Sequence, residues 1–566
     1  MSPDVTDPPL AALIRPPDQV MRLERLGAAF QTRLSFMRSL IRRLHDERWS
    51  IRRSLARLDA AGYGVAVYQA KGPARTYSLV AFSHALDPAK RTDRVIAEAW
   101  DATFVLFDGV PGEADIARLA GQTPKQEAGR FTPRELVLSR ANKSVRLFDH
   151  IVDRLAAGRQ PDRDMLMAVG YLMRTTAVYG NGKFGIADRA KYADRAELAG
   201  PFQAEMLNVY LIRCFTLDLV AHVARARARN RAVELSRTAR RYLGIGNATG
   251  LGMAPFLVNH PILIHNWIWA RERAFARVRA VGDPRPDRRA RFAAVLDRAR
   301  DFVAEWRVGD QIQTARITRL RADLAAIAAW FGQDAGAGAL WDRLYRRAEA
   351  ELSVEAQEML LSLMTEPYGD LVDDLSAEMS TDARRRIEPD AALGEIGTLL
   401  ETHYGWALGI DFAPAAANRF FWYVSAEKLE PRLGERDQEP GADKEMPLAV
   451  GRDVQALAAA LAERAHDQPV AALLEARPDL RHIVRRVQTL ARHPYGEIRD
   501  NLIGQGLRPI DLLRCKLSFF GAAKFDPKSD RWTRITLYQG APLPDELDRA
   551  DADDWCFATW NHAAAA

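Results

Sequence analysis

The sequence predicts a mainly helical protein with a multi-helix core and small α+β parts at its N- and C-terminal ends. Three observations support this fold class. Between residues 132 and 400, apolar residues recur at three- and four-residue steps, as on the buried faces of helices. Residues 64–70, 76–82 and 103–107 are instead short apolar runs, rich in β-branched and aromatic residues, with turn signals nearby. The tail from residue 410 onward mixes both patterns.

The bulk composition is that of a folded, cytoplasmic protein. A chain of 566 residues is long enough to form more than one hydrophobic core. Of its residues 48% are hydrophobic and 27% are charged, a composition that excludes a largely disordered chain. The cysteines, Cys214, Cys515 and Cys556, have neither metal-ligand nor disulfide spacing. A reducing compartment suits such cysteines, and the N-terminal residues show no secretion signal. We therefore expect a soluble protein of the cytoplasm.

The basic charge balance does not by itself predict a nucleic-acid partner. The chain has 80 basic and 74 acidic residues and a net charge of +6, and a basic protein is a candidate for nucleic-acid binding. Its arginines, however, alternate with carboxylates, as in residues 297–301, and this pattern is typical of solvated helix faces. A nucleic-acid partner is therefore an alternative and not the main expectation.

One uncharged stretch raises the question of a membrane. Residues 251–270 contain no Asp, Glu, Lys or Arg, and their length would allow a membrane span. The same stretch holds two histidines, two asparagines and two prolines, and charged residues follow it directly. These features favour a pair of buried helices broken at Pro261, so we expect no membrane partner.

The front of the chain is predicted to hold amphipathic helices followed by a small α+β module. Residues 18–60 repeat apolar side chains at helical steps and predict one or two helices. Strands are predicted at 64–70, 76–82 and 103–107, and a short helix at 91–100 lies between the second and the third.

The middle of the chain is predicted to be helical almost throughout. The segment Thr132-Pro133-Arg134-Glu135 is a capping box with proline at the first helical position, which marks the start of a helix. The predicted helices span residues 132–157, 161–178, 201–229, 254–281, 288–306, 314–331 and 339–364.

The tail is predicted to mix helices with strands at 420–425, 515–520 and 532–538, the last two forming a hairpin. Whether the front and back strands share one sheet stays open. Four parts follow: a flexible tail at 1–17, a helix with a small α+β module at 18–130, an all-helical core that carries the site at 131–400, and a mixed α/β region at 401–566.

The first candidate site segment is a glycine-rich run within residues 174–185. Its glycines fit the G-x-G-x-x-G pattern. The apolar residues before them recur at helical spacing, however, so the sequence does not predict the strand that a dinucleotide site requires. Arg174, Asn181 and Lys183 could instead hold a carboxylate or phosphate beside free backbone amides. The alternative is a loop that merely ends a helix.

The second candidate segment, residues 240–253, holds four glycines in nine residues and runs into the uncharged stretch. Arg240 and Arg241 could bind an anion in bidentate fashion, and Asn247 and Thr249 could position it or cap the following helix. Polar side chains come next in apolar surroundings: Asn259, His260 and His265. They either contact a ligand or cap the helix break at Pro261 and form hydrogen bonds with the backbone there.

Pairs of histidine and carboxylate at helical spacing form a third group. Asp218 and His222 lie four residues apart on an apolar helix, where a carboxylate orients an imidazole for acid–base work or forms a satisfied core pair. Glu463 with His466 would suit a metal, but the surrounding residues are strongly charged, as on solvated faces. We therefore predict no metal site.

These segments together predict a cytoplasmic enzyme that acts on an anionic small molecule, a carboxylate or phosphate, by acid–base chemistry in a buried helical pocket. The cofactor is unknown, and a homodimer is compatible with the size of the chain. Two alternatives stay open, a non-catalytic scaffold or nucleic-acid-associated protein and a flavin- or metal-dependent oxidoreductase. The predicted catalytic residues are His260, His265, Asp218 and His222, and the predicted substrate-binding residues are Arg174, Asn181, Lys183, Arg240, Arg241, Asn247, Thr249 and Asn259.

Overall fold

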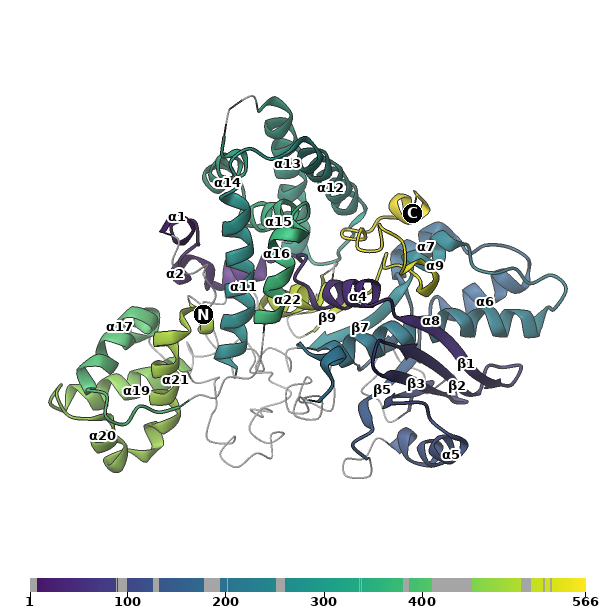
Figure 1. Cartoon of the computed structure of the whole chain (residues 1–566), viewed down its shortest axis with the longest axis horizontal. Helices are drawn as coiled ribbons and strands as arrows, with labels where there is room; N and C mark the ends of the chain where they lie inside the picture. Colours follow the sequence, from purple (N-terminus) through teal and green to yellow (C-terminus); the bar gives the residue numbers. More distant parts are fainter. Residues whose placement is uncertain are drawn as a thin grey trace.

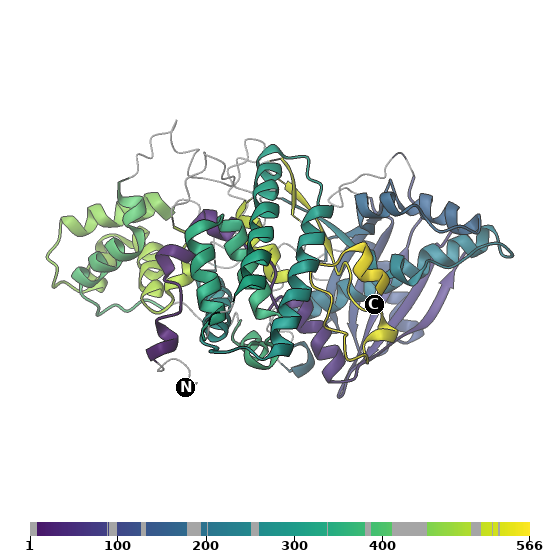
Figure 2. The ribbon, with the colours of Figure 1, turned by 90° about the horizontal axis from the view of Figure 1, so that it is seen from above.

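The structure, a computed structural model, consists of three parts that lie in a row (Figure 1, Figure 2). A β-sheet with its covering helices forms one end, a group of long helices forms the middle, and a small helical lobe forms the other end. The structure describes residues 8–87, 89, 99–125, 132–177, 194–200, 202–250, 260–334, 336, 338–379, 386–409, 450–499, 511–522, 525–529 and 532–565.

The sheet has nine strands in the order β1-β2-β3-β4-β5-β6-β7-β9-β8. Neighbouring strands are antiparallel except β6 and β7, which are parallel. The strands are β1 (Ser50–Leu58), β2 (Gly64–Lys71), β3 (Thr76–Ser83), β4 (Ala102–Asp108), β5 (Glu135–Lys143), β6 (Tyr171–Thr175), β7 (Gly244–Gly250), β8 (Asp526–Ser529) and β9 (Trp532–Leu537).

The fold class predicted from the sequence is wrong, because strands are not confined to small parts at the two ends. β5, β6 and β7 come from the stretch predicted to be helical, and they join the front strands to β9 and β8 at the back of the chain. Helices still form the majority of the structure. The molecule is therefore a helix-rich protein built around a large mixed sheet. β2, β3, β4 and β9 confirm the strands predicted at 64–70, 76–82, 103–107 and 532–538.

One cause of these errors is the ambiguity of short buried runs such as β6. A strand buried on both faces shows a continuous apolar run, and so does a short buried helix. The carboxylate of Glu135 accepts from the backbone N–H of Thr132, as in a capping box, yet the chain then enters β5. Conversely, the strand predicted at 515–520 lies within helix α22 (Asp511–Phe520).

Helix α8 (Gln203–Arg227) packs lengthwise against the sheet and contacts strands from β2 to β7. Its other sides are covered by α4 (Phe36–Asp46) and α6 (Phe148–Ala156). Most of its residues are buried, as expected of a helix packed between a sheet and other helices. Among the described residues α8 is the one helix long and apolar enough to cross a membrane by length and composition, and 83% of its apolar window is buried inside the molecule.

A second, smaller core lies on the other face of the front strands. There α5 (Glu113–Gln122) places Ile116 and Leu119 against apolar side chains of β2, β3 and β4, among them Val80 and Phe107. The front of the sheet is therefore buried on both faces, whereas the edge strand β1 is largely exposed.

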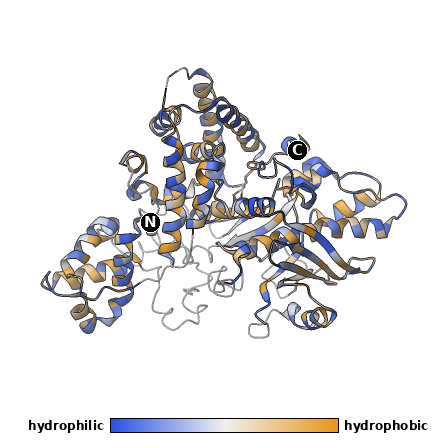
Figure 3. Ribbon diagram, in the orientation of Figure 1, coloured by the Kyte–Doolittle hydropathy of each residue, from blue (hydrophilic) through white to orange (hydrophobic). Residues whose placement is uncertain are grey.

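Long helices form the middle part of the molecule (Figure 1). Both hydrophilic and hydrophobic residues occur along each of them, as Figure 3 shows, so each helix can turn an apolar face toward the shared core. These helices are α11 (Pro261–Arg279), α12 (Pro286–Glu305), α13 (Gln311–Gln333), α14 (Leu340–Glu351), α15 (Val354–Thr365) and α16 (Gly369–Val372). Helix α11 begins at Pro261, where the sequence predicted a break.

The small lobe at the far end consists of α17 (Leu393–Leu408), α19 (Val450–Ala462), α20 (Val470–Ala476) and α21 (Arg481–Arg492). The remaining short helices connect the parts. They are α1 (Pro8–Ala11), α2 (Pro17–Val20), α3 (Leu23–Gly27), α7 (Arg163–Val169), α9 (Arg237–Tyr242) and α23 (Trp560–Ala565), with 3₁₀ turns at Thr123–Lys125, Ala196–Leu198, Asp373–Glu378, Pro478–Leu480, Pro494–Gly496 and Pro544–Glu546.

Buried ion pairs attach the N-terminal segment to the middle helices. The guanidinium group of Arg15 donates to Glu272 and to Glu358, each at 2.6 Å, and both carboxylates are fully buried. Burial alone would raise the pKa of Glu358, but Arg15 and Arg271 hold it well below its usual range. A buried charge needs such partners, because an unpaired one costs several kcal/mol, about 3–5 kcal/mol when one partner is removed.

Candidate functional site

Two of the predicted binding residues lie side by side on the parallel strands β6 and β7. Arg174 Nε donates to the hydroxyl of Tyr171 at 2.7 Å, and Asn247 Nδ2 donates to the carbonyl of Thr175 at 2.9 Å. Both side chains are buried. Thr249 lies further along β7, paired with Thr533 of β9.

The glycines of this region are required by the packing of the sheet. A Cβ atom at Gly244 would lie 2.2 Å from the carbonyl oxygen of Leu537, and one at Gly246 would lie 2.6 Å from the ring of Tyr171. The ring of Tyr171 therefore packs directly on the backbone of β7. The glycine-rich run 244–250 is thus a strand and not a ligand-binding loop. Asn181, Lys183 and Asn259 lie outside the described residues.

The pair Asp218 and His222 connects α8 to the front hairpin. The carboxylate of Asp218 accepts from the hydroxyl of Tyr68 at 2.7 Å and from Arg53 at 3.0 Å. His222 Nε2 donates to the carbonyl of Asp59 at 2.7 Å. Burial and the neighbouring carboxylate raise the pKa of Tyr68. These contacts position β1 and β2 on α8.

His265 lies in an aromatic cluster on α11. Its Nδ1 accepts from the backbone N–H of Tyr495 at 3.2 Å, and its ring lies 5.0 Å from the ring of His493. Burial, together with His493, lowers the pKa of His265 to about 3, so the imidazole is neutral at pH 7. His260 is the residue that precedes the first turn of α11.

Arg240 and Arg241 are adjacent on α9 but have different surroundings. Arg241 is buried, and its guanidinium group lies 3.6 Å from the carboxylate of Glu546. Arg240 is half-buried and lines an open groove. The predicted site residues that the structure describes thus occupy four separate places, and among them Arg240 lines a groove large enough for a small molecule.

We call this space the β1 groove, because it begins where α4 ends and β1 starts. Its volume is about 1090 Å³. The lining comes from the end of α4, the start of β1, α9 and the 3₁₀ turn at Pro544–Glu546. The lining residues are His45, Asp46, Arg48, Trp49, Ser50, Ile51, Arg240, Pro544, Asp545 and Asp548.

Arg48 has a backbone conformation that L-residues rarely adopt. Arg48 lies just beyond the end of α4 and has a φ of 52°. The backbone N–H of Trp49, the next residue, donates to the carbonyl of Leu44 in α4 at 2.9 Å. Helices that end in this way normally have glycine at the left-handed position. A side chain in this conformation costs about 1–2 kcal/mol. The guanidinium group of Arg48 is exposed and makes no hydrogen bond or ion pair with any described residue.

Arg240 faces the same groove from the last turn of α9. The helix is fixed at its start by Ser236, whose hydroxyl accepts from the backbone N–H of Ala239, and its later carbonyls accept from Arg213. Within the described part of the chain, the guanidinium group of Arg240 forms no ion pair. The groove therefore presents two guanidinium groups that pair with no carboxylate of the described residues.

His45 has a defined orientation in the groove. Its Nδ1 lies 2.6 Å from the carbonyl oxygen of Leu547, and a carbonyl only accepts, so Nδ1 carries the hydrogen. In the neutral imidazole Nε2 then carries the lone pair and can accept a proton. The carboxylate of Asp46 lies 4.0 Å from Nε2.

The groove also contains acidic residues. Asp545 lies 3.3 Å from Arg237, which balances its charge, while Asp46 and Asp548 face the groove as well. Carboxylates at this position accept hydrogen bonds from hydroxyl groups. The groove thus combines anion-binding donors, hydroxyl-binding acceptors and a base.

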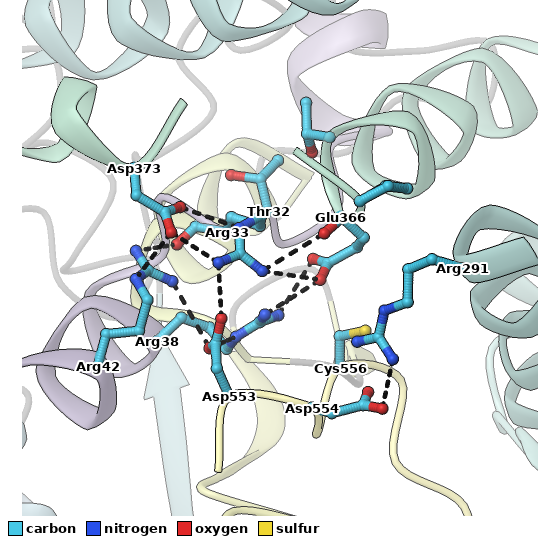
Figure 4. Close-up of polar contacts among 12 residues, drawn as sticks. Thr32, Arg33, Arg38, Arg42, Arg291, Glu366, Asp373, Asp553, Asp554 and Cys556 are labelled. Carbon is cyan, nitrogen blue, oxygen red and sulfur yellow. Dashed lines mark hydrogen bonds and ion pairs between the residues drawn. The ribbon is translucent and has the colours of Figure 1, made fainter. Parts of the chain in front are cut away.

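A group of closely packed charged side chains, which we call the arginine cluster, lies elsewhere and has a different character (Figure 4). It contains Arg33, Arg38 and Arg42 from the N-terminal segment. Arg38 donates to both Glu366 and Asp553, and Arg33 donates to Asp373 at 2.6 Å.

Because each of these guanidinium groups already contacts a carboxylate, the arginine cluster has no charge left for a ligand. Burial raises the pKa of the neighbouring Cys556 to about 11, so its thiol is protonated and not a nucleophile at neutral pH. Within the described residues no group of three or more His, Cys, Asp or Glu side chains could hold a metal ion.

Comparisons with protein-family models, with curated proteins and with solved structures found no match to this chain. Sequence reasoning missed the groove residues His45 and Arg48 and the acidic residues Asp46, Asp545 and Asp548. No local pattern singles them out, because the left-handed backbone of Arg48 and the carbonyl partner of His45 appear only in the folded chain.

Proposed function

We propose that the protein binds a small hydroxylated anion, a carboxylate or a phosphate ester, in the β1 groove and acts on it by acid–base chemistry. Arg48 and Arg240 bind the anionic group. The carboxylates of Asp46, Asp545 and Asp548 accept hydrogen bonds from the hydroxyl groups, and His45 acts as the base.

The observation that supports this proposal most is the conformation of Arg48. Glycine at the same position would satisfy the helix end and would avoid the strain of a left-handed side chain. A strained residue that persists beside a groove indicates that its side chain has a use there. Arg240, the second arginine of the groove without an ion pair to any described residue, supports that use, since two guanidinium groups bind a carboxylate or phosphate far better than one.

Binding is tested by titration calorimetry at low ionic strength with D-glucose 6-phosphate, D-gluconate and D-glucose. We expect both anions to bind and glucose to bind at least tenfold more weakly. Arg48→Gly and Arg240→Ala should each weaken anion binding by about 10- to 100-fold, because a charge-assisted hydrogen bond contributes about 1.5–3 kcal/mol.

Arg229→Ala is the matched control, since Arg229 is also an exposed arginine without an ion pair to any described residue but lies outside the groove. This variant should bind the anions as the unchanged protein does. Equal affinity of Arg48→Gly and the unchanged protein, or no binding of either anion, would overturn the proposal.

The chemical step is tested with His45→Gln, which keeps a donor for the carbonyl of Leu547 but lacks a base. In D2O we expect the unchanged protein to replace the C2 proton of the bound sugar acid or sugar phosphate, which proton NMR detects as loss of that signal. The His45→Gln variant should bind the probe and leave the signal intact. Exchange that continues in this variant would show that His45 is not the base.

A further inference from the structure

The buried carboxylate of Glu546 joins two of the segments that line the β1 groove. Glu546 is the last residue of the short 3₁₀ turn in the lining and is 1% exposed. Residues on either side of it line the groove, Asp545 before it and Asp548 after it. The carbonyl of Leu547, the next residue, accepts from Nδ1 of His45. Any shift of Glu546 would therefore move several groups of the site at once.

The carboxylate of Glu546 closes the turn that carries it. Its Oε2 accepts from the backbone N–H of Leu543 at 2.7 Å, and the backbone N–H of Glu546 donates to the carbonyl of Leu543 at 2.9 Å. A hydrogen bond to an ionised carboxylate is about twice as strong as one between neutral groups. The side chain of Glu546 thus fixes the backbone of the turn.

The same carboxylate also binds α9. Arg237 Nε donates to Glu546 Oε1 at 2.5 Å, and the guanidinium group of Arg241 lies 3.6 Å from Oε2. Arg240, which lines the groove, belongs to the same short helix. Glu546 therefore links the helix that presents Arg240 to the turn whose next carbonyl holds His45.

A second residue, Arg213 of α8, holds the same two segments by their backbones. Arg213 is 2% exposed. Its guanidinium group donates to the carbonyls of Arg240 and Arg241, each at 3.0 Å, and to the carbonyl of Pro542 at 3.2 Å. These contacts lie before the turn in the C-terminal segment. A change at Glu546 should therefore release the turn while α9 stays in place.

We infer that Glu546 is a positioning residue of the β1 groove, which sets where the carbonyl of Leu547 holds His45. The inference rests on the proposed function, in which His45 is the base. While Nδ1 donates to the carbonyl, Nε2 keeps the lone pair that accepts a proton. An imidazole released from the carbonyl can carry its hydrogen on Nε2 instead, and it then accepts no proton there.

The tautomer of His45 tests the inference without any ligand. In protein labelled with nitrogen-15 histidine, NMR distinguishes a ring nitrogen that carries hydrogen from one that carries a lone pair, and the His45→Gln variant identifies the signals of His45. We expect the neutral ring to carry its hydrogen on Nδ1 in the unchanged protein. Glu546→Gln keeps the size of the side chain and removes its charge. It should raise the ratio of the Nε2–H form to the Nδ1–H form by about fivefold or more, since the hydrogen bond to the carbonyl is weakened. An unchanged ratio would overturn the inference.

Proton exchange at C2 of D-glucose 6-phosphate gives a second readout. Glu546→Gln should slow this exchange at least tenfold, while the dissociation constant should change by less than threefold because α9 stays in place. Exchange at the rate of the unchanged protein would overturn the inference. If the sugar phosphate does not bind to the unchanged protein, the proposed function fails, and the tautomer of His45 still decides whether Glu546 positions it.

Glu497→Gln is the matched control for general stability. Glu497 is also a buried glutamate that accepts from an arginine, but this arginine, Arg486, belongs to the small lobe. The control should lower the melting temperature and leave both the tautomer ratio of His45 and the exchange rate unchanged. If it changed them as much as Glu546→Gln does, the effect would come from general stability and the inference would fall.

Arg237→Ala gives a test that does not depend on a buried side chain. The side chain of Arg237 is 51% exposed, so this variant should fold normally. It should shift the tautomer ratio of His45 in the same direction as Glu546→Gln. Because Arg237 acts through Glu546, the double variant should shift the ratio no further than Glu546→Gln alone. No shift in Arg237→Ala, or a double variant whose shift is the sum of the two, would overturn the inference.

Discussion

At the scale of single residues, charged side chains in this protein serve two different purposes. Arg15 is buried and fully engaged by Glu272 and Glu358. Arg48 is exposed, adopts a strained backbone conformation and contacts no carboxylate among the described residues. The first kind stabilises the fold. The second kind costs stability, which is typical of residues kept for binding.

The cost at Arg48 is measurable. Arg48→Gly should increase the free energy of unfolding by about 1 kcal/mol, because glycine adopts the left-handed conformation without strain. Urea unfolding of the two proteins measures the difference. The same substitution is expected to weaken anion binding, so stability and affinity should change in opposite directions. A loss of stability in Arg48→Gly would show that the side chain supports the fold and would contradict our interpretation.

At the scale of elements, β7 explains why the sheet was hard to predict. Glycine is rare inside strands, and a glycine-rich run normally indicates a loop. In β7 the glycines allow the ring of Tyr171 and the carbonyl of Leu537 to approach the backbone. The strand exists because its neighbours cover it, and the residues that cover Gly246 lie about seventy positions away in the chain.

Alanine at Gly246 tests this explanation. Its Cβ atom would overlap the ring of Tyr171, so Gly246→Ala should destabilise the protein by about 1–3 kcal/mol or more. Gly397→Ala in α17 is the control, since a Cβ atom there meets no atom within 4 Å. The control should be neutral or stabilising by about 0.5–1 kcal/mol. Thermal unfolding of both variants distinguishes the two cases, and equal melting temperatures would refute the packing argument.

At the scale of the whole molecule, the arginine cluster joins three regions of the chain (Figure 4). Arg33, Arg38 and Arg42 belong to the N-terminal segment that leads into the sheet, Glu366 follows a middle helix, and Asp553 belongs to the C-terminal segment. Burial alone would raise the pKa of Asp553, but Arg38 and Arg42 lower it far below its usual value. The two ends of the chain are therefore held together by charge.

This arrangement makes the junction sensitive to acid. A carboxylate whose pKa is lower in the folded state contributes stability above its unfolded pKa, about 3.9, and loses that contribution as the pH falls further. Asp553→Asn should therefore lower the melting temperature clearly at pH 7, and the difference from the unchanged protein should shrink below pH 4. Calorimetric scans at pH 7 and below pH 4 measure this difference in melting temperature. A difference that is the same at both pH values would show that the carboxylate charge is not what holds the junction.

The sequence predicted what depends on neighbours along the chain. Periodic apolar residues located the long helices α8, α11, α12 and α13, and alternating β-branched runs located β2, β3, β4 and β9. Pro261 was identified as a helix boundary, and α11 begins there. For the same reason Arg240, an arginine beside a glycine-rich run, was singled out before its groove was known.

The tertiary structure alone decided what depends on residues far apart in the chain. β5, β6 and β7 are strands because the sheet pairs them, although their local patterns resemble helices or loops. The β1 groove unites His45 and Arg48 with Asp545, five hundred residues later. Local composition determines whether a segment prefers helix or strand, but a site requires contacts between distant residues that only folding supplies.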